Sequence, residues 1–396
     1  MLDWLTNILA MTFHHSAFLR TTIYMTIPTP STEFPATTVA PNSIVGPNGP
    51  DELGGYNPHL SAPLTFSAQE PWLAPLAGYS DLSFRLLCRE QGAAVCCTEM
   101  VSAKGLVYKS SGTNDLLTTT IHDAPLVVQL FGRDTDIMVQ AMEQLMSQGF
   151  RYFDLNMGCS VPKVNKTGCG SAMLRDLPNA VDVAKTMVKT AGVGHVGFKF
   201  RLGWDATQEV YLDLAKSLEQ IGAAWLTLHP RYARQGFSGT ARWSALSEIV
   251  NAVSIPVIAS GDLMTATDGI RCIQETGVAT VMYARGAMND PGIFAAHKAI
   301  MAGEPDPAYE PRRIHALISR HASLAKHYAH GRSGLLKMRT FVPRYVRHMS
   351  GARALRQHLA SCFEWDMLDD VLALFFDRNV QGNWPPEENV GPEEGK

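Results

Sequence analysis

The sequence lacks the cysteine spacing of a disulfide framework or of a structural zinc site. Its seven cysteines are an odd number without repeated metal-ligand spacing, and adjacent Cys96 and Cys97 lie within an apolar stretch, as core residues would. We therefore expect a reduced, cytoplasmic protein that holds no metal. The chain has 396 residues, of which 46% are hydrophobic and 18% charged, enough for one barrel-sized domain and a smaller one.

The first 24 residues lack the uninterrupted apolar run of about 18 residues that a membrane-spanning helix needs. They also lack the basic start of a signal peptide, because Asp3 precedes the first Lys or Arg. Residues 28–65 are rich in Pro, Thr, Ser, Gly and Asn, a composition typical of disorder. We expect residues 1–65 to form a disordered extension without membrane association, which an over-long start or a targeting segment would explain equally well.

Carboxylates are absent from one stretch of fifty residues, Pro311 to Ala360, which contains eleven Lys and Arg. The net charge of the whole chain is −3, so the remainder carries −14, the difference between −3 and +11. A basic block on an acidic protein favours a polyanionic partner such as a nucleic acid. The alternative is a helix face that is merely solvated.

Short apolar runs recur along the chain at the spacing of strands that alternate with helices. Eight such runs cover residues 71–77, 93–100, 125–131, 152–157, 196–200, 225–229, 256–259 and 280–284. The amphipathic stretches between them, such as 134–148 and 208–221, are long enough for crossover helices. This α/β pattern matches a (β/α)8 TIM barrel better than an open doubly wound sheet, since no Gly-x-Gly-x-x-Gly follows the first run.

After Pro291 the strand spacing stops, and apolar residues recur at helical spacing from 312 to 376. The segment 303–307, Gly-Glu-Pro-Asp-Pro, is typical of a join between domains. We therefore expect a TIM barrel over residues 66–303 and a small C-terminal helical domain over 308–380. Residues 381–396 are acidic and rich in Pro and Gly, and we expect a disordered tail there.

Polar residues follow or end successive runs, at the edge where parallel barrels carry their chemistry. These residues are Pro75 to Asp81 after the first run, Gln129 in the third, Cys159 just beyond the fourth, Lys199 and Arg201 at the fifth, and His229 at the sixth. The seventh and eighth runs lead into Ser260-Gly261-Asp262 and Ala284-Arg285-Gly286. Loops at those two positions frequently bind a phosphate through backbone N–H groups, to which Arg285 would add a cation, although ordinary strand-to-helix turns would look the same.

Each of these residues also has an ordinary structural explanation. Cys159 could be a buried apolar cysteine, Gln129 a lone polar residue in a strand, and His229 a hydrogen-bonded core histidine. Lys199 is harder to explain in this way, because a lysine within Val-Gly-Phe-Lys-Phe needs a buried anionic partner. Taken together, the set favours a functional site.

Several short motifs occur in a fixed order along residues 71–376. They are Ala74-Pro75-Leu76-Ala77-Gly78 with Asp81, Thr98-Glu99-Met100, Val128-Gln129-Leu130, Asn156-Met157-Gly158-Cys159, Lys199-Phe200-Arg201, His229-Pro230-Arg231, Gly261-Asp262 and Arg285. Each motif is weak alone, but the ordered set resembles the tRNA-dihydrouridine synthase family.

The resemblance implies a flavoenzyme oxidoreductase that reduces a uridine of tRNA. It implies that FMN is bound by Pro75, Leu76, Ala77, Gln129, Lys199, His229, Ser260, Gly261, Asp262, Ala284 and Arg285, and that NADPH or NADH reduces it. Cys159 would donate a proton to uracil, and Asn156 and Arg201 would lie close to the base. We expect the enzyme to act as a monomer.

The helical domain of this family binds tRNA, while the barrel receives a uridine flipped from its stack. The resemblance therefore implies that the basic block contacts phosphates. Lys337, Arg339, Arg344 and Arg347 follow one another at spacings of two, five and three, and we expect them to cluster on one side of a helix and to bind tRNA.

The chain departs from the family pattern at four positions. Ser160 replaces the usual proline after the cysteine, and Pro230 stands where a small residue normally follows the histidine. Ser260 replaces the usual asparagine and Ala284 the usual glycine, so the affinity for flavin is expected to differ. None of the four changes removes a reacting group.

Two other functions fit parts of the sequence. A flavin-dependent barrel dehydrogenase of a small pyrimidine or related substrate would use the same pocket, but it would have no use for eleven clustered cations. An RNA-binding protein that has lost catalysis would use the cations, but it would have no need of Cys159, Lys199 and His229. The sequence does not indicate which uridine is reduced.

Overall fold

The computed structural model describes residues 62–307, 309–329 and 331–381. Eight parallel strands form a closed barrel: β1 (Trp72–Leu73), β2 (Val95–Cys97), β4 (Leu126–Phe131), β5 (Tyr152–Met157), β6 (Val196–Arg201), β7 (Trp225–His229), β8 (Val257–Ala259) and β9 (Thr280–Tyr283). Pairing of β1 with β9 and of β2 with β4 closes the ring. The predicted TIM barrel and all eight predicted strands are confirmed.

One strand was not predicted. The two-residue β3 (Val101–Ser102) pairs with the end of β4, where Val101 lies opposite Leu130. It continues the line of β2 along β4, beyond the break at residues 98–100. A strand this short has no periodicity of its own, and it forms only because β4 is present to pair with it.

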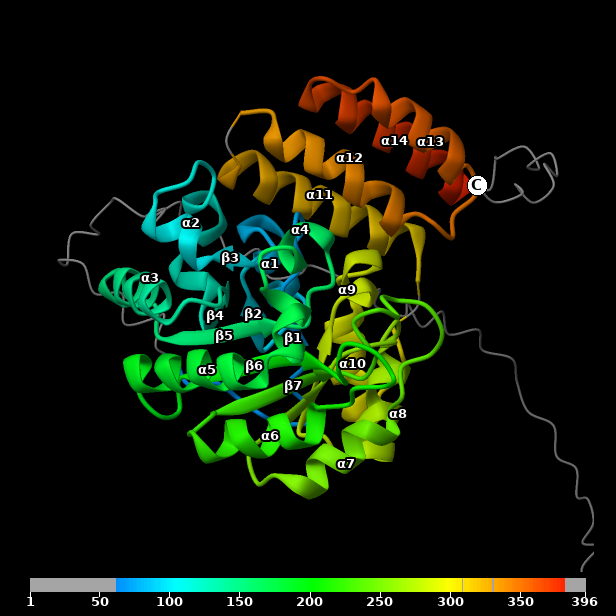
Figure 1. The fold of residues 1–396 in the computed structure, drawn as a ribbon. Coiled ribbons are helices and arrows are strands. Elements are labelled where there is room, and N and C mark those ends of the chain that lie inside the picture. Colours follow the sequence, from blue (N-terminus) through cyan, green and yellow to red (C-terminus); the bar gives the residue numbers. More distant parts are fainter. Residues whose placement is uncertain (1–61, 308, 330, 382–396) are drawn as a thin grey trace, which may run out of the picture. The chain divides into compact units, whose positions relative to one another are not determined.

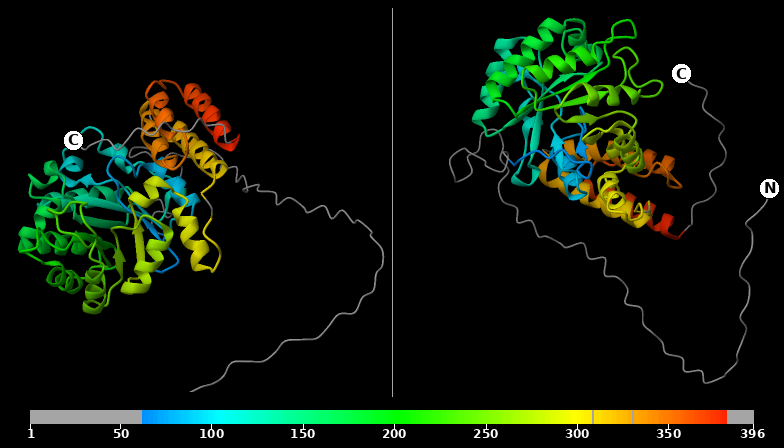
Figure 2. Two further views of the ribbon diagram at one scale, coloured as in Figure 1. Left: turned by 90° about the vertical axis from the view of Figure 1, so that its right-hand side faces the viewer. Right: turned by 90° about the horizontal axis from the view of Figure 1, so that it is seen from below.

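Helices surround the strands, as Figure 1 and Figure 2 show from three sides. They are α1 (Leu82–Glu90), α2 (Ala103–Val107), α3 (Thr135–Ser147), α4 (Pro162–Asn165), α5 (Leu177–Ala191), α6 (Tyr211–Gln220), α7 (Ser244–Ala252), α8 (Ala266–Thr276), α9 (Arg285–Asn289) and α10 (Ile293–Met301), with the short 3-10 helices η2 (Asn114–Leu117), η3 (Ile121–Asp123) and η4 (Gly170–Arg175). The predicted helix over 134–148 is α3, whose N-cap Asp134 accepts from the amide of Ile137. The helix predicted from 208 begins later, at Tyr211.

The N-terminal end of the barrel, where the strands begin, is filled by aromatic rings. Trp72 and Trp225 are fully buried, with ring centroids 5.7 Å apart, and Phe66 lies 5.3 Å from Trp72. Gly197 on β6 makes room for Trp225, because a Cβ there would lie 1.9 Å from the indole. Trp72 also donates to the carbonyl of Thr65, so packing against the barrel begins just before residue 66. This filling leaves only the C-terminal end of the barrel for a ligand.

Among the described residues, four helices form the C-terminal helical region, called the helical domain below: α11 (Pro311–Tyr328), α12 (Ser333–Tyr345), α13 (Ala352–Ala360) and α14 (Trp365–Gln381). The helical periodicity predicted over 312–376 therefore corresponds to four separate helices. Tyr345 and His321 are hydrogen-bonded to each other inside this domain at 3.0 Å. Arg320 of α11 forms an ion pair with Glu90 of α1, which ties the helices to the barrel.

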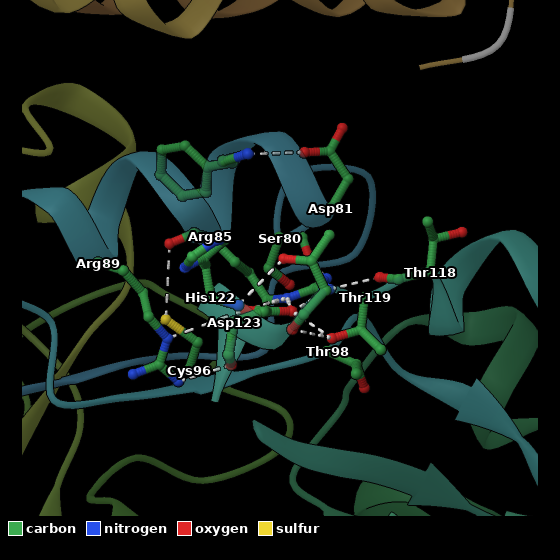
Figure 3. A network of polar contacts seen from close by, with 12 residues as sticks. Ser80, Asp81, Arg85, Arg89, Cys96, Thr98, Thr118, Thr119, His122 and Asp123 are labelled. Atoms are coloured by element: carbon green, nitrogen blue, oxygen red, sulfur yellow. Dashed lines mark hydrogen bonds and ion pairs between the residues drawn. The ribbon is translucent and has the colours of Figure 1, made fainter. Parts of the chain in front are cut away.

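A buried ion pair fixes the loop that follows β1 (Figure 3). Arg85 and Asp123 are almost fully buried and 2.7 Å apart, and Thr119 also donates to this carboxylate. Arg85 donates to the carbonyls of Ser80 and Thr118, so the guanidinium joins α1 to two loops. Because nearly every donor has a partner, the pair serves as an anchor for the segment that precedes α1.

The described residues contain neither a candidate membrane span nor a candidate metal site. Among the helices that the structure describes, none combines the length and apolar character needed to cross a membrane. Within the same residues, no group of three or more His, Cys, Asp or Glu side chains could hold a metal ion. The extension predicted over 1–65 and the tail predicted over 381–396 lie almost entirely outside the described residues.

Candidate active site

A cavity of about 250 Å³ opens at the C-terminal end of the barrel. All fourteen barrel residues that the sequence assigned to a site line it: Pro75, Leu76, Ala77, Gln129, Asn156, Cys159, Lys199, Arg201, His229, Ser260, Gly261, Asp262, Ala284 and Arg285. They come from seven of the eight strands and from the loops that follow them. Sequence reasoning therefore found the position of the cavity and most of its polar wall.

Cys159 lies two residues beyond β5, in the loop before α4. Its backbone N–H donates to Asn156 Oδ1 at 2.9 Å, and its carbonyl accepts from the amide of Ser171 at 2.9 Å. Gly170 packs so closely that a Cβ there would lie 2.7 Å from this carbonyl. Burial raises the pKa of the Cys159 thiol above its usual value, against the opposing effects of Val161 and Arg201. The thiol therefore stays protonated at neutral pH, as a proton donor must.

A chain of side-chain hydrogen bonds runs beneath the cavity. Gln129 Nε2 donates to Asp154 Oδ2 at 2.7 Å, and Asn156 Nδ2 donates to Gln129 Oε1 at 2.8 Å. Asn156 Oδ1 then accepts from the amides of Gly158 and Cys159. Both ends of the Gln129 amide are thus engaged with the protein, although each retains capacity for one more hydrogen bond.

Lys199 on β6 is one of the residues that line the cavity. Burial lowers the pKa of its ammonium, and Asp154 on the neighbouring strand opposes that shift. Burial raises the pKa of Asp154, and the hydrogen bond from Gln129 and the charge of Lys199 oppose it. Asp154 is therefore the anionic partner that the sequence required for Lys199 but did not identify. Among the described residues, no hydrogen bond or direct ion pair joins the Lys199 ammonium, which leaves its donors for a ligand.

His229 at the end of β7 is neutral. Burial, followed by the charges of Arg201, Lys199, Arg231 and Arg285, lowers the pKa of its imidazole well below the usual range. Arg231 Nη1 lies 3.3 Å from His229 Nε2, and because a guanidinium can only donate, Nε2 is the accepting nitrogen. The hydrogen on Nδ1 is then available to a ligand.

Asp262 organises the cations on the side of the cavity formed by β8 and β9. Its carboxylate accepts from Arg231 at 2.7 Å, from the amide of Ala241 at 2.7 Å and from Arg285 at 3.3 Å. Its backbone has a positive φ of 55°, next to Gly261 at 118°. A Cβ on Gly261 would lie 2.7 Å from the imidazole of His229, so glycine is needed for this loop to pack against His229.

Arg201 forms one wall and connects two loops. Its Nε donates to the carbonyl of Gly158 at 2.8 Å, and its Nη1 donates to the carbonyls of Tyr232 and Gly236. Its guanidinium lies 5.6 Å from the ring of Phe237, which is 61% exposed and is also approached by Arg285 at 4.9 Å. Arg201 thus holds the Cys159 loop and an exposed aromatic ring on the same side of the cavity.

Several cavity residues escaped the sequence reasoning because they are apolar or bind only other side chains. Met100, Met264, Met282 and Phe237 line the cavity and give it apolar surface. Arg231 and Asp154 stand behind its wall. The motif analysis quoted Arg231, but nothing in the sequence showed that it bonds to His229 and Asp262.

The helical domain contacts the loop after β1, which is part of the cavity wall. Lys337 of α12 forms an ion pair with Asp81 at 2.6 Å and lies 3.8 Å from Glu99. Glu99 in turn accepts from the amide of Gly78 at 2.5 Å. Arg344 donates to the hydroxyl of Tyr79 at 2.9 Å. Two cations of α12 therefore brace residues 78–81, immediately beyond Pro75 to Ala77.

The prediction that four cations cluster on one side of a helix is wrong. Lys337 and Arg344 contact the barrel, whereas Arg339 donates to the carbonyl of Ala360 at the end of α13. Arg347 lies beyond the end of α12 and donates to its neighbour His348. The reason is geometric, since a spacing of two residues turns a helix by about 200° and places the two side chains on opposite sides.

Five cations of the basic block are paired with carboxylates from outside it. The pairs are Arg313 with Asp290, Arg320 with Glu90, Lys326 with Asp369, Arg332 with Glu364, and Lys337 with Asp81. Arg353 and Arg356 of α13 are exposed, and within the described residues neither has a hydrogen bond or an ion pair. The positive charge that is open to a partner is therefore smaller than the count of eleven suggests.

Comparison with known proteins gives a consistent result. The family model described as Dihydrouridine synthase (Dus) matches residues 72–379. The probable tRNA-dihydrouridine synthase 1 of Synechocystis sp. is 33% identical over 324 residues, which cover 81% of this chain and 90% of that protein. The probable tRNA-dihydrouridine synthase of Mycobacterium tuberculosis is 33% identical over 316 residues, which cover 76% of this chain and 80% of that protein. The tRNA-dihydrouridine synthase B of Pseudomonas aeruginosa is 31% identical over 285 residues, which cover 72% of this chain and 86% of that protein.

Proposed function

The chain belongs to the dihydrouridine synthase family, a family of oxidoreductase flavoenzymes, and we propose that it reduces a uridine of tRNA to 5,6-dihydrouridine. FMN is the proposed cofactor and NADPH or NADH the proposed reductant. The observation that carries the proposal is that Cys159 shares one cavity with Lys199, whose ammonium forms no hydrogen bond with any described residue, and with the apolar side chains of Met100 and Met282. Burial raises the pKa of the Cys159 thiol, which favours its protonated form.

The apolar walls and the donors of the cavity support flavin mononucleotide as the proposed ligand. Backbone from Ala74 to Ala77 and the methionine side chains provide flat apolar walls for a ring system. Gly261 and Arg285 line the same part of the cavity, where Arg285 offers a cation for a phosphate. Lys199 and Nδ1 of His229 offer donors to the polar edge of a ring.

When bound, the flavin supplies the hydride that reaches C6 of uracil, after the nicotinamide cofactor has reduced it. Cys159 holds a proton on its thiol and delivers it to C5 of the base. Asn156 and Arg201 hold the loop that carries this thiol, through the amide of Cys159 and the carbonyl of Gly158. Lys199 places positive charge where negative charge develops during reduction.

RNA recognition is proposed for the helical domain. Exposed cations such as Arg347, Arg353 and Arg356 suit phosphate contacts, which supply affinity without sequence information. A uridine would have to leave its stack to reach Cys159. We also propose that the enzyme works as a monomer in the cytoplasm, and its free cysteines agree with a reducing compartment.

The proposal is tested by purifying the full chain and identifying what it carries and what it does. We expect absorbance in the flavin bands, release of FMN on heating, and formation of dihydrouridine in unmodified tRNA when NADPH or NADH is added. A protein that binds FMN and reduces a free pyrimidine, but not tRNA, would favour the small-molecule dehydrogenase instead.

A further inference from the structure

The hydrogen-bond chain beneath the cavity begins at a carboxylate and ends at the backbone of the Cys159 loop. It runs from Asp154 on β5 through Gln129 on β4 to Asn156 on β5, with heavy-atom distances of 2.7 and 2.8 Å. The final links, from the amides of Gly158 and Cys159 to Asn156 Oδ1, measure 3.1 and 2.9 Å. Register pairing of Gln129 with Asp154 keeps the first two members side by side.

The direction of this chain is decided by Asp154. An ionised carboxylate only accepts, so the nitrogen of the Gln129 amide must face it. The oxygen of Gln129 then faces Asn156 and selects its nitrogen. As a result the oxygen of Asn156 faces the two loop amides, which are donors and need an acceptor.

A purely structural role does not require a charge at this position. Asp154 is only 3% exposed, and its Oδ1 has no hydrogen-bond partner among the described residues. Burying a carboxylate with one oxygen unsatisfied is costly, and an asparagine of the same size would fill the space with less desolvation. What an asparagine would lose is the direction, because it can donate as well as accept.

We propose that Asp154 is a positioning residue, whose charge orients the amides of Gln129 and Asn156 so that they hold the Cys159 loop. The charge of Lys199, on the adjacent strand, favours the ionised form of that carboxylate against the effect of burial. The inference rests on the proposed function only in that Cys159 is the proton donor. The orientation itself can be measured on the resting protein, without reductant or tRNA.

The test is hydrogen exchange of the full-length protein as purified, followed at the amides of Gly158 and Cys159. In Asp154→Asn both directions of the chain become available, and in one of them Asn156 presents its nitrogen to the loop amides. We expect exchange at these two amides to rise roughly fivefold, the factor that corresponds to a net hydrogen-bond free energy of about 1 kcal/mol. Circular dichroism and the melting temperature establish that the variant is folded.

A second variant moves the carboxylate to the other end of the chain. In Asp154→Asn/Asn156→Asp, the asparagine donates to Gln129, Gln129 donates to the new aspartate, and that aspartate still accepts from both loop amides. We expect exchange to return to the rate of the parent protein. Loss of packing at position 154 would not be repaired by this change, so restoration indicates that the carboxylate acts through the hydrogen-bond chain.

Two further variants make the result decisive. Thr227→Val removes another buried, unpartnered side-chain oxygen from the barrel interior without touching the chain, and its exchange should match that of the parent. Gln129→Met interrupts the hydrogen-bond chain at its middle, and we expect it to give the same rise in exchange. It replaces Asp154→Asn as the test if Asp154→Asn fails to fold. Unchanged exchange in the folded Asp154 and Gln129 variants, an equal rise in Thr227→Val, or no restoration in the double variant would overturn the proposal.

Discussion

The cations of the barrel mouth and those of the helical domain differ in what surrounds them. Arg201 and Arg231 are buried, and their donors are engaged with backbone carbonyls, with His229 and with Asp262. In the helical domain, Arg353 and Arg356 are exposed and lack such partners among the described residues. Buried cations set a fixed electrostatic environment, whereas exposed ones suit reversible contact with phosphates.

Lys337 and Arg344 belong to the helical domain in sequence but act with the barrel. Their partners are Asp81 and Tyr79, next to the proposed flavin-binding loop. The position of a cation in the sequence therefore does not decide its role. Its role depends on the partners that the fold brings to it.

Cys159→Ala should have the largest effect and should divide the two half-reactions. Removing a general acid typically lowers the rate by about 10²- to 10⁴-fold, so turnover on tRNA should fall by that amount. Flavin content and reduction of the flavin by NADPH should remain those of the parent. An equal loss in both half-reactions, measured by stopped-flow absorbance, would make Cys159 a structural residue.

Lys199→Met should lower the rate of flavin reduction by about 10²-fold, because removal of one preorganised donor from a buried site has an effect of that order. The melting temperature should fall, because the buried carboxylate of Asp154 loses its cationic partner. Arg285→Met is the matched control, because the Arg285 side chain is 41% exposed. We expect this variant to weaken flavin binding and to leave the rate of flavin reduction nearly unchanged. Comparable reduction rates in parent and Lys199→Met would remove the electrostatic role.

The uridine half-reaction should depend on pH through Cys159. The reactive form is the protonated thiol, and burial raises the pKa of that thiol. The rate should therefore hold through neutral pH and fall only as pH rises through the raised pKa, by about tenfold per unit. Single-turnover reoxidation of the reduced protein by tRNA measures this profile. A rate that increases with pH over the same range would mean that a thiolate is the reactive form.

Replacement of Arg347, Arg353 and Arg356 by alanine should weaken tRNA binding and flatten its salt dependence. Each lost phosphate contact reduces the slope of log K against log salt by about 0.7 to 0.9. Arg320→Ala with Lys326→Ala is the matched control, since both cations are already paired with carboxylates. If the control flattens the slope as much as the triple variant does, the paired cations contribute to binding equally.

Lys337→Met should have the smallest effect, and it should appear in flavin retention rather than in the salt slope. The side chain braces Asp81 and Glu99, and Glu99 holds the amide of Gly78. We expect a few-fold weaker flavin affinity, consistent with a partly exposed ion pair worth about 1 kcal/mol or less. A flattened salt slope with unchanged flavin affinity would return Lys337 to the RNA-binding set.

Much of the fold followed from the sequence because its signals are local. The apolar runs that became β4 to β9 are each bounded by turn residues, and the polar residues after them lie at one edge by the geometry of parallel strands. The break at residues 98–100 and the two-residue β3 could not be predicted, since the pairing of β3 depends on β4.

The site was predicted only as far as side chains face the cavity. Lys199 indicated a buried anion, but its identity as Asp154 depends on which strands become neighbours. Likewise, nothing local shows that Glu99 reaches Gly78 or that Arg231 reaches His229. The error over the α12 cations is of another kind, because the helical angle of about 100° per residue was already enough to separate Lys337 from Arg339.

The central claim, that the barrel mouth reduces a uridine presented by RNA, is tested most directly by one anaerobic experiment. The purified protein is reduced with NADPH, freed of excess reductant and mixed with unmodified tRNA, while flavin absorbance and dihydrouridine are followed together. We expect reoxidation of the flavin at the rate at which dihydrouridine appears, with one dihydrouridine formed per flavin. Reoxidation by free pyrimidines but not by tRNA, or tRNA binding without reoxidation, would contradict the account.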